Sequence, residues 1–431
     1  MTLYEIKKRI ICAIEENYEW IINLGDTVRN NPELGYCEEK TSALVREVFD
    51  KLKITYVYPV AMTGVKAKSV GRSHGLNVCI MGEMDALRCA GNHRANVDGN
   101  THACGHNAQI AAMLGAAIGL EMSKVMKEID GTITYMAIPA EEFIDLEYRE
   151  KIREQGKIQY FGGKQQLIAE GVFNDVDMAM MIHAQPKEEQ AKLYVRGHNL
   201  GFLAKTITFH GKAAHGSTPF DGVNALNASA LAILGMHSNR ETFREEDRIR
   251  IHPIITKGGE VVNSVPDEVC MDTYVRGATL EAINKGNVCV ERSCEGAATM
   301  VGATVTFKNT PGYLPLKESM ELSFVMEENA KALMGENSIV EGQEITGSTD
   351  AGDLSHILPV IQPSIGGFIG GLHSKEFDIA NKETAYIIAA KLLALTAAEL
   401  LYNNCEKARN VKSKFVPHMT KEQYIEYLKG K

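Results

Sequence analysis

Residues 82–114 read GEMDALRCAGNHRANVDGNTHACGHNAQIAAML, and the interpretation of the whole chain starts from this stretch. It begins at the end of an apolar run, continues as a polar loop and reaches His102, Cys104 and His106 just before an alanine-rich segment. That order predicts a strand, a loop and a helix. Gly105 lets the backbone turn sharply, so that a thiolate and an imidazole can reach one metal ion. A buried thiol beside a surface histidine is the alternative interpretation.

The composition is typical of a globular protein with two domains. The chain has 431 residues, of which 45% are hydrophobic, so it exceeds one ordinary core. It contains no run of eighteen apolar residues and no secretory signal, and no membrane partner is expected. Nine cysteines without framework spacing favour reduced thiols in a cytoplasmic protein. A net charge of -9 without a basic cluster argues against a nucleic-acid partner.

Apolar periodicity predicts alternating helices and strands in the first part of the chain. The expected helices cover 3–30, 37–52 and 108–122, and the expected strands cover 54–60, 64–70 and 77–83. Two further apolar strands should end at the Glu141–Glu142 pair and at His183. This alternation predicts an α/β domain with a mostly parallel sheet that is covered on both faces.

The pattern changes near Val195, which predicts a domain boundary. The next segments read as strand, helix, strand, strand, helix and strand, the order of the ferredoxin-like split βαβ unit. After about Gly312 the chain is expected to return to the first domain. The predicted domains are therefore a metal-binding catalytic domain of residues 1–194 plus 312–431, and an inserted lid and dimerisation domain of residues 195–311.

Polar side chains stand at three of the expected strand ends, where open α/β sheets bind ligands. They are Glu83 with Asp85, Glu141 with Glu142, and His183. Two adjacent glutamates after an apolar strand are costly unless a cation or hydrogen bonds compensate their charge. A helix that begins with acidic residues would also explain the glutamates, and His183 could be a histidine of the core.

The late segment GGFIGGLHS adds a further candidate. Its four glycines free the backbone to approach a ligand and would pack poorly in a core, which directs attention to His373. This segment completes an ordered series of motifs: GEMDAL, HACGHN, PAEE, IHAQP, GKAAHGSTPFDGVNAL, GSTDAGDLS and GGLHS. The series resembles that of the aminoacylase and carboxypeptidase-type di-metal amidohydrolase family, in its HACGH branch, and within it the aminobenzoyl-glutamate hydrolase-like proteins. The resemblance extends from about Pro32 to Tyr402.

The resemblance implies a role for each candidate residue of the first domain. The ligands of two divalent ions, zinc or manganese, would be Cys104, His106, Glu142, His183 and His373. Five protein ligands leave room for a water between the metals, as a catalytic site requires. Glu141 would be the general base that deprotonates this water, and Asp85 would orient a ligand. Alternatively, Asp85 is a strand-end carboxylate that caps the following loop.

Three residues of the second domain also receive implied roles. His215, in GKAAHGS, would enter the active site of the neighbouring subunit in a homodimer and stabilise the oxyanion. Asn263 and Arg276 would bind the free carboxylate of the substrate, for which the planar guanidinium is well suited. Without the motifs, these residues would be interpreted as a loop histidine, a turn residue and an exposed strand charge.

Three positions depart from the pattern of the branch. Glu83 stands where aspartate is common, Arg88 where proline is common, and Gln109 where a further histidine is common. None of these changes removes an implied metal ligand, so the predicted chemistry is retained.

The sequence therefore predicts a metal-dependent amidohydrolase that uses metal-activated water to cleave N-acyl or N-aroyl amino acids. Aminobenzoyl-glutamate-like conjugates, N-acyl amino acids and dipeptides are the expected small-molecule substrates, each with a free carboxylate. A catalytically silent member that acts as a binding or assembly subunit is the alternative.

Overall fold

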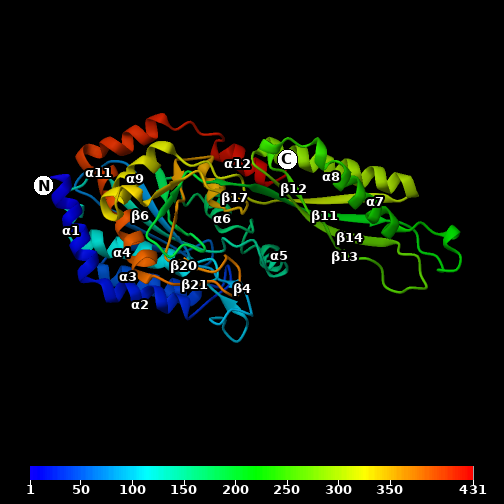
Figure 1. The fold of residues 1–431 in the computed structure, drawn as a ribbon, viewed down its shortest axis with the longest axis horizontal. Coiled ribbons are helices and arrows are strands. Elements are labelled where there is room, and N and C mark those ends of the chain that lie inside the picture. The colour runs from blue at the N-terminus through cyan, green and yellow to red at the C-terminus, as the bar shows by residue number, and fades with distance from the viewer. Residues whose placement is uncertain (431) are drawn as a thin grey trace. The chain divides into compact units, whose positions relative to one another are not determined.

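The computed structural model describes residues 1–430, and the chain divides into two compact units (Figure 1). The first unit consists of Met1–Gly197, Lys317–Glu344 and Asp353–Lys421, and the second of His198–Leu316, Ile345–Gly352 and Glu422–Lys431. The main boundaries lie within a few residues of the predicted ones. Two short segments, 345–352 and 422–431, belong to the second unit, although the sequence placed them in the catalytic domain.

The N-terminal region forms two helices where the sequence predicted one over 3–30. They are α1 (Leu3–Glu16) and α2 (Tyr18–Arg29), which meet at Asn17. The Asn17 amide donates a hydrogen bond to the carbonyl oxygen of Ala13 at 2.8 Å, and its backbone leaves the helical conformation. Asparagine interrupts helices in this way because its side chain competes for backbone hydrogen bonds. The next helix, α3, spans Glu39–Leu52.

A six-stranded sheet with the order β1-β2-β6-β3-β7-β18 forms the centre of the first unit. Its strands are β1 (Thr55–Val60), β2 (Gly64–Val70), β3 (Asn77–Glu83), β6 (Thr132–Ile138), β7 (Met178–Met180) and β18 (Val360–Ile361). The last four in spatial order are parallel, whereas β1 and β2 add an antiparallel edge. Every residue of β3 is buried, so both faces of the sheet are covered there. The predicted α/β class with a mostly parallel sheet is confirmed.

Helix α4 (His106–Met122) packs on β3 and is enclosed by α1, α2 and α11 (Figure 1). A helix surrounded in this way needs small side chains, and a Cβ on Gly115 would lie 2.7 Å from the Ala390 Cβ. Helix α11 (Ala389–Lys414) follows a π-helical turn, Glu383–Ile388, and packs against α9 (Met320–Met334). The segment Glu383–Lys414 is long and apolar enough to cross a membrane, but its apolar window is 94% buried, as in a core helix.

The strand expected to run to His183 is instead broken into two. Strand β7 ends at Met180, and β8 (His183–Ala184) joins a second sheet with the order β16-β9-β19-β8. The other members of that sheet are β9 (Leu193–Val195), β16 (Ile339–Glu341) and β19 (Ser364–Ile365). The segment that pairs with this strand contains Pro363, which has no N–H group to continue the hydrogen-bonded ladder. The break directs His183 towards the start of α4.

The main sheet of the second unit is antiparallel and has the order β12-β14-β11-β15, in which β13 also pairs with β14. In chain order its elements are β11 (Gly201–His210), α7 (Ala225–Ser238), β12 (Arg250–Ile251), β13 (Ile254–Lys257), β14 (Glu268–Gly277), α8 (Leu280–Val301) and β15 (Thr304–Pro311). The two helices cover one face, where Ile207, Val269 and Val290 are buried. This arrangement agrees with the split βαβ order.

The described chain also contains further short strands and α-helices. They are β4 (Leu87–Arg88), β5 (Asn100–Thr101), α5 (Leu146–Glu154), α6 (Gly163–Ala169), β10 (His198–Asn199), β17 (Glu344–Ile345), α10 (Ala351–Ser355), β20 (Phe368–Ile369), β21 (Asp378–Ile379) and α12 (Lys421–Leu428).

Candidate metal centre

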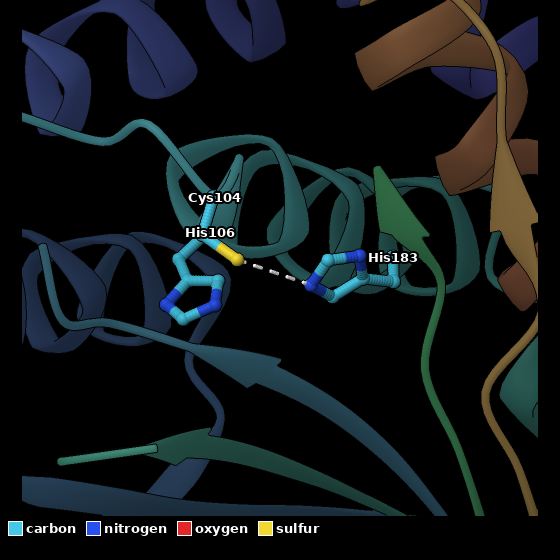
Figure 2. A group of neighbouring side chains, drawn as sticks. All are labelled: Cys104, His106 and His183. Atoms are coloured by element: carbon cyan, nitrogen blue, oxygen red, sulfur yellow. Dashed lines mark hydrogen bonds between the residues drawn. The ribbon is translucent and has the colours of Figure 1, made fainter. Parts of the chain in front are cut away.

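Cys104 and His106 stand where the loop after β3 enters α4, and His183 faces them from β8 (Figure 2). Gly105 between them has a φ of +83°, in the left-handed region. A Cβ at this position would lie 2.7 Å from the Cβ of Ala184, so both the conformation and the available space require glycine. The sharp turn predicted from the sequence is present.

The five predicted ligands converge in space. The Cys104 Sγ lies 3.5 Å from His183 Nε2 (Figure 2) and 3.4 Å from His373 Nε2. The His373 Nε2 is in turn 3.0 Å from the Glu142 Oε1. Two groups result, each with its candidate ligand atoms within 4.8 Å of one another: Cys104, His106 and His183, and Cys104, Glu142 and His373. Both groups contain Cys104, so its thiolate would contribute to the binding of both metal ions.

His373 reaches the site through an unusual backbone. Its φ is +58°, a conformation that costs free energy in a non-glycine residue and often occurs at functional sites. The His373 N–H donates to the carbonyl oxygen of Ala103 at 2.8 Å, which ties this loop to the loop before α4. His373 is exposed whereas Cys104 and Glu142 are buried, so solvent reaches the centre at His373.

Asp85 fixes the orientation of His106. Its Oδ1 and its carbonyl oxygen lie 3.1 and 2.9 Å from the His106 Nδ1, and its Oδ2 accepts a hydrogen bond from the Glu142 N–H at 2.9 Å. Burial disfavours the charge on Asp85, but the hydrogen bond from His106 and its positive charge hold the Asp85 pKa at about 2. The buried His106 Nε2 makes no hydrogen bond of good geometry among the described residues, although the Glu83 Oε2 lies 3.2 Å away, and this leaves the nitrogen available to a metal ion.

The ionisation of the centre fits a set of metal ligands. Burial alone would raise the pKa of the Cys104 thiol, but the positive charges of His183 and His106 outweigh it and hold this pKa well below its ordinary value. Burial and the Cys104 charge raise the pKa of Glu142 to about 7. Without a metal the two charged histidines stabilise the thiolate, and a divalent cation held by their neutral rings would take over this role.

The two glutamates follow β6 on an irregular segment, and α5 begins only at Leu146. Ala140 before them has a φ of +53°, and its N–H donates to the Glu38 Oε1 at 2.8 Å. Glu142 joins Cys104 and His373, whereas the Glu141 Oε2 lies 3.9 Å from the His106 Nε2. The strand end therefore aims the two carboxylates at different parts of the centre, as different roles require.

A buried lysine at the centre was missed by the sequence analysis. The Lys164 Nζ donates to the Glu83 Oε1 at 2.6 Å, and the Gln109 Nε2 donates to the Glu83 Oε2 at 2.7 Å. The Glu83 Oε2 also lies 3.2 Å from the His106 Nε2. Glu83 and Gln109 are two of the three positions that differ from the branch pattern, and their side chains are hydrogen-bonded to each other. One feature of the sequence could have indicated that Lys164 is buried. Its neighbours three and four residues away in the sequence are apolar or aromatic.

The three predicted residues of the second domain lie in the second unit. His215 is exposed, with its Nδ1 2.7 Å from the Ser217 Oγ, and the Gly216 N–H donates to the carbonyl oxygen of Asn263 at 2.7 Å. Arg276 is the second-last residue of β14 and donates to the Ser348 Oγ at 2.8 Å. His215 and Asn263 are therefore close to each other, and their roles at the metal centre stay predictions.

Residues 79–399 match the sequence profile of peptidase family M20/M25/M40, which covers most of the chain. The chain belongs to this family. It is 26% identical to an IAA-amino acid hydrolase ILR1-like protein of Arabidopsis thaliana, with 83% of this chain and 80% of the relative covered. It is also 26% identical to the Xaa-Arg dipeptidase of Mus musculus, with 97% and 94% covered.

Solved structures share the fold. A dinuclear metal-binding peptidase of the M20 family from Bacillus subtilis matches with a TM-score of 0.71 and 22% identity over 90% of this chain and 99% of that one. An aminobenzoyl-glutamate utilization protein from Klebsiella pneumoniae matches with a TM-score of 0.64 and 19% identity over 90% and 98%. The predicted family is confirmed, and membership indicates a metal-dependent hydrolase of amide bonds.

Proposed function

We propose that the protein hydrolyses the amide bond between an acyl or aroyl group and an amino acid with a free α-carboxylate, dipeptides included. The observation that carries this proposal is the pair of ligand groups that share Cys104, with Glu141 beside them. The names of the relatives support it, because an IAA-amino acid hydrolase and an Xaa-Arg dipeptidase both act on amides of amino acids.

The side chains divide the reaction between them. Two divalent ions, zinc or manganese, held by the five ligands would polarise the amide carbonyl and acidify a water molecule. Asp85 holds the His106 ring so that Nε2 faces the ligand groups. Glu141 takes the proton of the water on its carboxylate and delivers it to the leaving nitrogen. Arg276 and Asn263 hold the α-carboxylate of the substrate.

The proposed assembly is a homodimer formed through the second unit, in which His215 serves the partner's centre and stabilises the oxyanion. Exposed apolar side chains close in the sequence to His215 and to Asn263 support an interface here. Phe220 is 82% exposed and Val262 is fully exposed, which is costly unless another surface covers them.

A substrate panel tests the proposal. Aminobenzoyl-glutamate, N-acyl amino acids and dipeptides are assayed with added manganese, zinc or cobalt, and at least one class should be hydrolysed in a metal-dependent way. Glu141→Gln should retain the metal content of the wild type and lose about a hundred-fold or more in kcat, because the proton acceptor is gone. A protein that binds these compounds without turnover in any metal is instead the silent binding subunit.

A further inference from the structure

The second unit contains a cavity of about 820 Å³ with a strongly basic lining. Five arginines line it: Arg240, Arg244, Arg248, Arg250 and Arg276. Among the described lining residues, Glu245 is the single carboxylate. The chain as a whole carries a net charge of -9, so this concentration of positive charge is local. Such a cavity attracts anions.

Two of the arginines are neighbours on adjacent strands of the sheet. Arg250 on β12 and Arg276 on β14 are direct partners in the antiparallel register, so their side chains leave the same face of the sheet. Arg276 lies against the rings of Phe202 and Tyr274, and no carboxylate pairs with either arginine within the side chains that the structure describes. Like charges directly opposite each other destabilise a sheet. An anion bound between the two guanidinium groups would remove this electrostatic repulsion.

The chemistry of the proposed reaction identifies that anion. One guanidinium group binds one carboxylate through two parallel hydrogen bonds. In the proposed function, the guanidinium group of Arg276 binds the α-carboxylate. Arg250, in the same cavity and on the same face, remains available for a second carboxylate. We infer that the cavity binds the side-chain carboxylate of an acidic amino acid, so that the preferred substrates are amides of dicarboxylic amino acids. The inference rests on the proposed function, and the same arginines repel a cationic side chain.

Arg250 is the residue to change, because its side chain is exposed and β12 is held to β14 through the main chain. Arg292 provides a matched control. It is an exposed arginine on α8, it donates to the Asn239 Oδ1 at 2.8 Å, and it does not line the cavity. Arg250→Gln and Arg292→Gln therefore remove the same charge from the same unit.

The test compares kcat/KM for conjugates that share one acyl group and differ in the amino acid: glutamate, glutamine or lysine. The wild type should prefer glutamate to glutamine by roughly ten-fold, mainly through KM, and should handle lysine worst. Arg250→Gln should reduce the ratio of glutamate to glutamine to near one, and Arg292→Gln should keep it. A wild type without this preference, or an Arg250→Gln variant that retains it, overturns the inference.

Two further measurements complete the design. If N-succinyl-glutamine is preferred to N-acetyl-glutamate, the second carboxylate belongs to the acyl half and the inference is wrong. If no amide is hydrolysed, the proposed function fails, and calorimetry with the full chain still tests the cavity. Glutarate should then bind more tightly than butyrate to the wild type, and this difference should disappear in Arg250→Gln. Equal binding of glutarate and butyrate to the wild type contradicts the inference.

Discussion

Lys164 carries a positive charge in a fully buried position, where it forms an ion pair with the equally buried Glu83. Removing one member of a buried pair leaves the other charge uncompensated and typically costs about 3–5 kcal/mol. Lys164→Met and Glu83→Gln should therefore each destabilise the metal-free protein, and the double variant should lose less than the sum of the two. Urea denaturation of the four proteins measures this coupling. Additive losses would show that the two side chains do not depend on each other.

Glu318 predicts a pH dependence of stability. Burial raises its pKa from 4.5 to about 7, and its Oε1 accepts a hydrogen bond from the Gln362 N–H at 2.7 Å. The folded protein therefore keeps a proton between these two values that the unfolded chain releases, and this contribution to stability is lost as the pH rises through 7. Its upper limit is about 3 kcal/mol.

Glu318→Gln removes this titration. The unfolding free energies of the wild type and the variant are measured at pH 5 and pH 8. The stability of the variant relative to the wild type should be greater at pH 8 than at pH 5. The same difference at both pH values would mean that Glu318 is ionised in the folded protein throughout.

At the scale of single residues, the motifs indicated which side chains to examine, and the fold brought the five expected ligands together. Lys164 could not be predicted in its role, because its partner Glu83 is distant in the sequence and no local spacing connects them. Asp85 could be expected to orient a ligand, but only the structure shows that this ligand is His106.

The turn between β5 and α4 depends on Gly105. An alanine there combines the cost of a left-handed conformation, about 1 kcal/mol, with a collision against Ala184 on β8. Gly105→Ala should thus lower metal affinity as well as the melting temperature. Gly156 also has a positive φ, with nothing within 4 Å of an added Cβ, so Gly156→Ala carries the conformational cost alone. If both variants bind metal equally well, the turn does not shape the centre.

The sequence predicted most elements from their periodicity and erred where a break depends on a specific interaction. The helix over 3–30 is divided because the Asn17 side chain bonds to Ala13, although the apolar spacing continues. The strand towards His183 leaves the central sheet beside Pro363, which belongs to a segment far along the chain. Periodicity within one segment contains no information about such a neighbour.

At the scale of the whole molecule, the proposed homodimer predicts complementation between inactive variants. His215→Ala lacks the residue supplied to the partner, and Glu141→Gln lacks the base of its own centre. After mixing and subunit exchange, each mixed dimer contains one centre with both groups, so about a quarter of the wild-type activity should return. Activity of His215→Ala alone at the wild-type level, or no recovery despite exchanged subunits, would argue against a shared site.

The central claim is that five side chains from distant parts of the chain hold two metal ions through one shared thiolate. The most direct test is the metal content of the purified protein after loading with manganese or zinc, measured by mass spectrometry against protein concentration. The account predicts two ions per chain in the wild type, and a loss of both in Cys104→Ala at an unchanged fold by circular dichroism. One ion or none in the wild type, or two ions retained in Cys104→Ala, would contradict it.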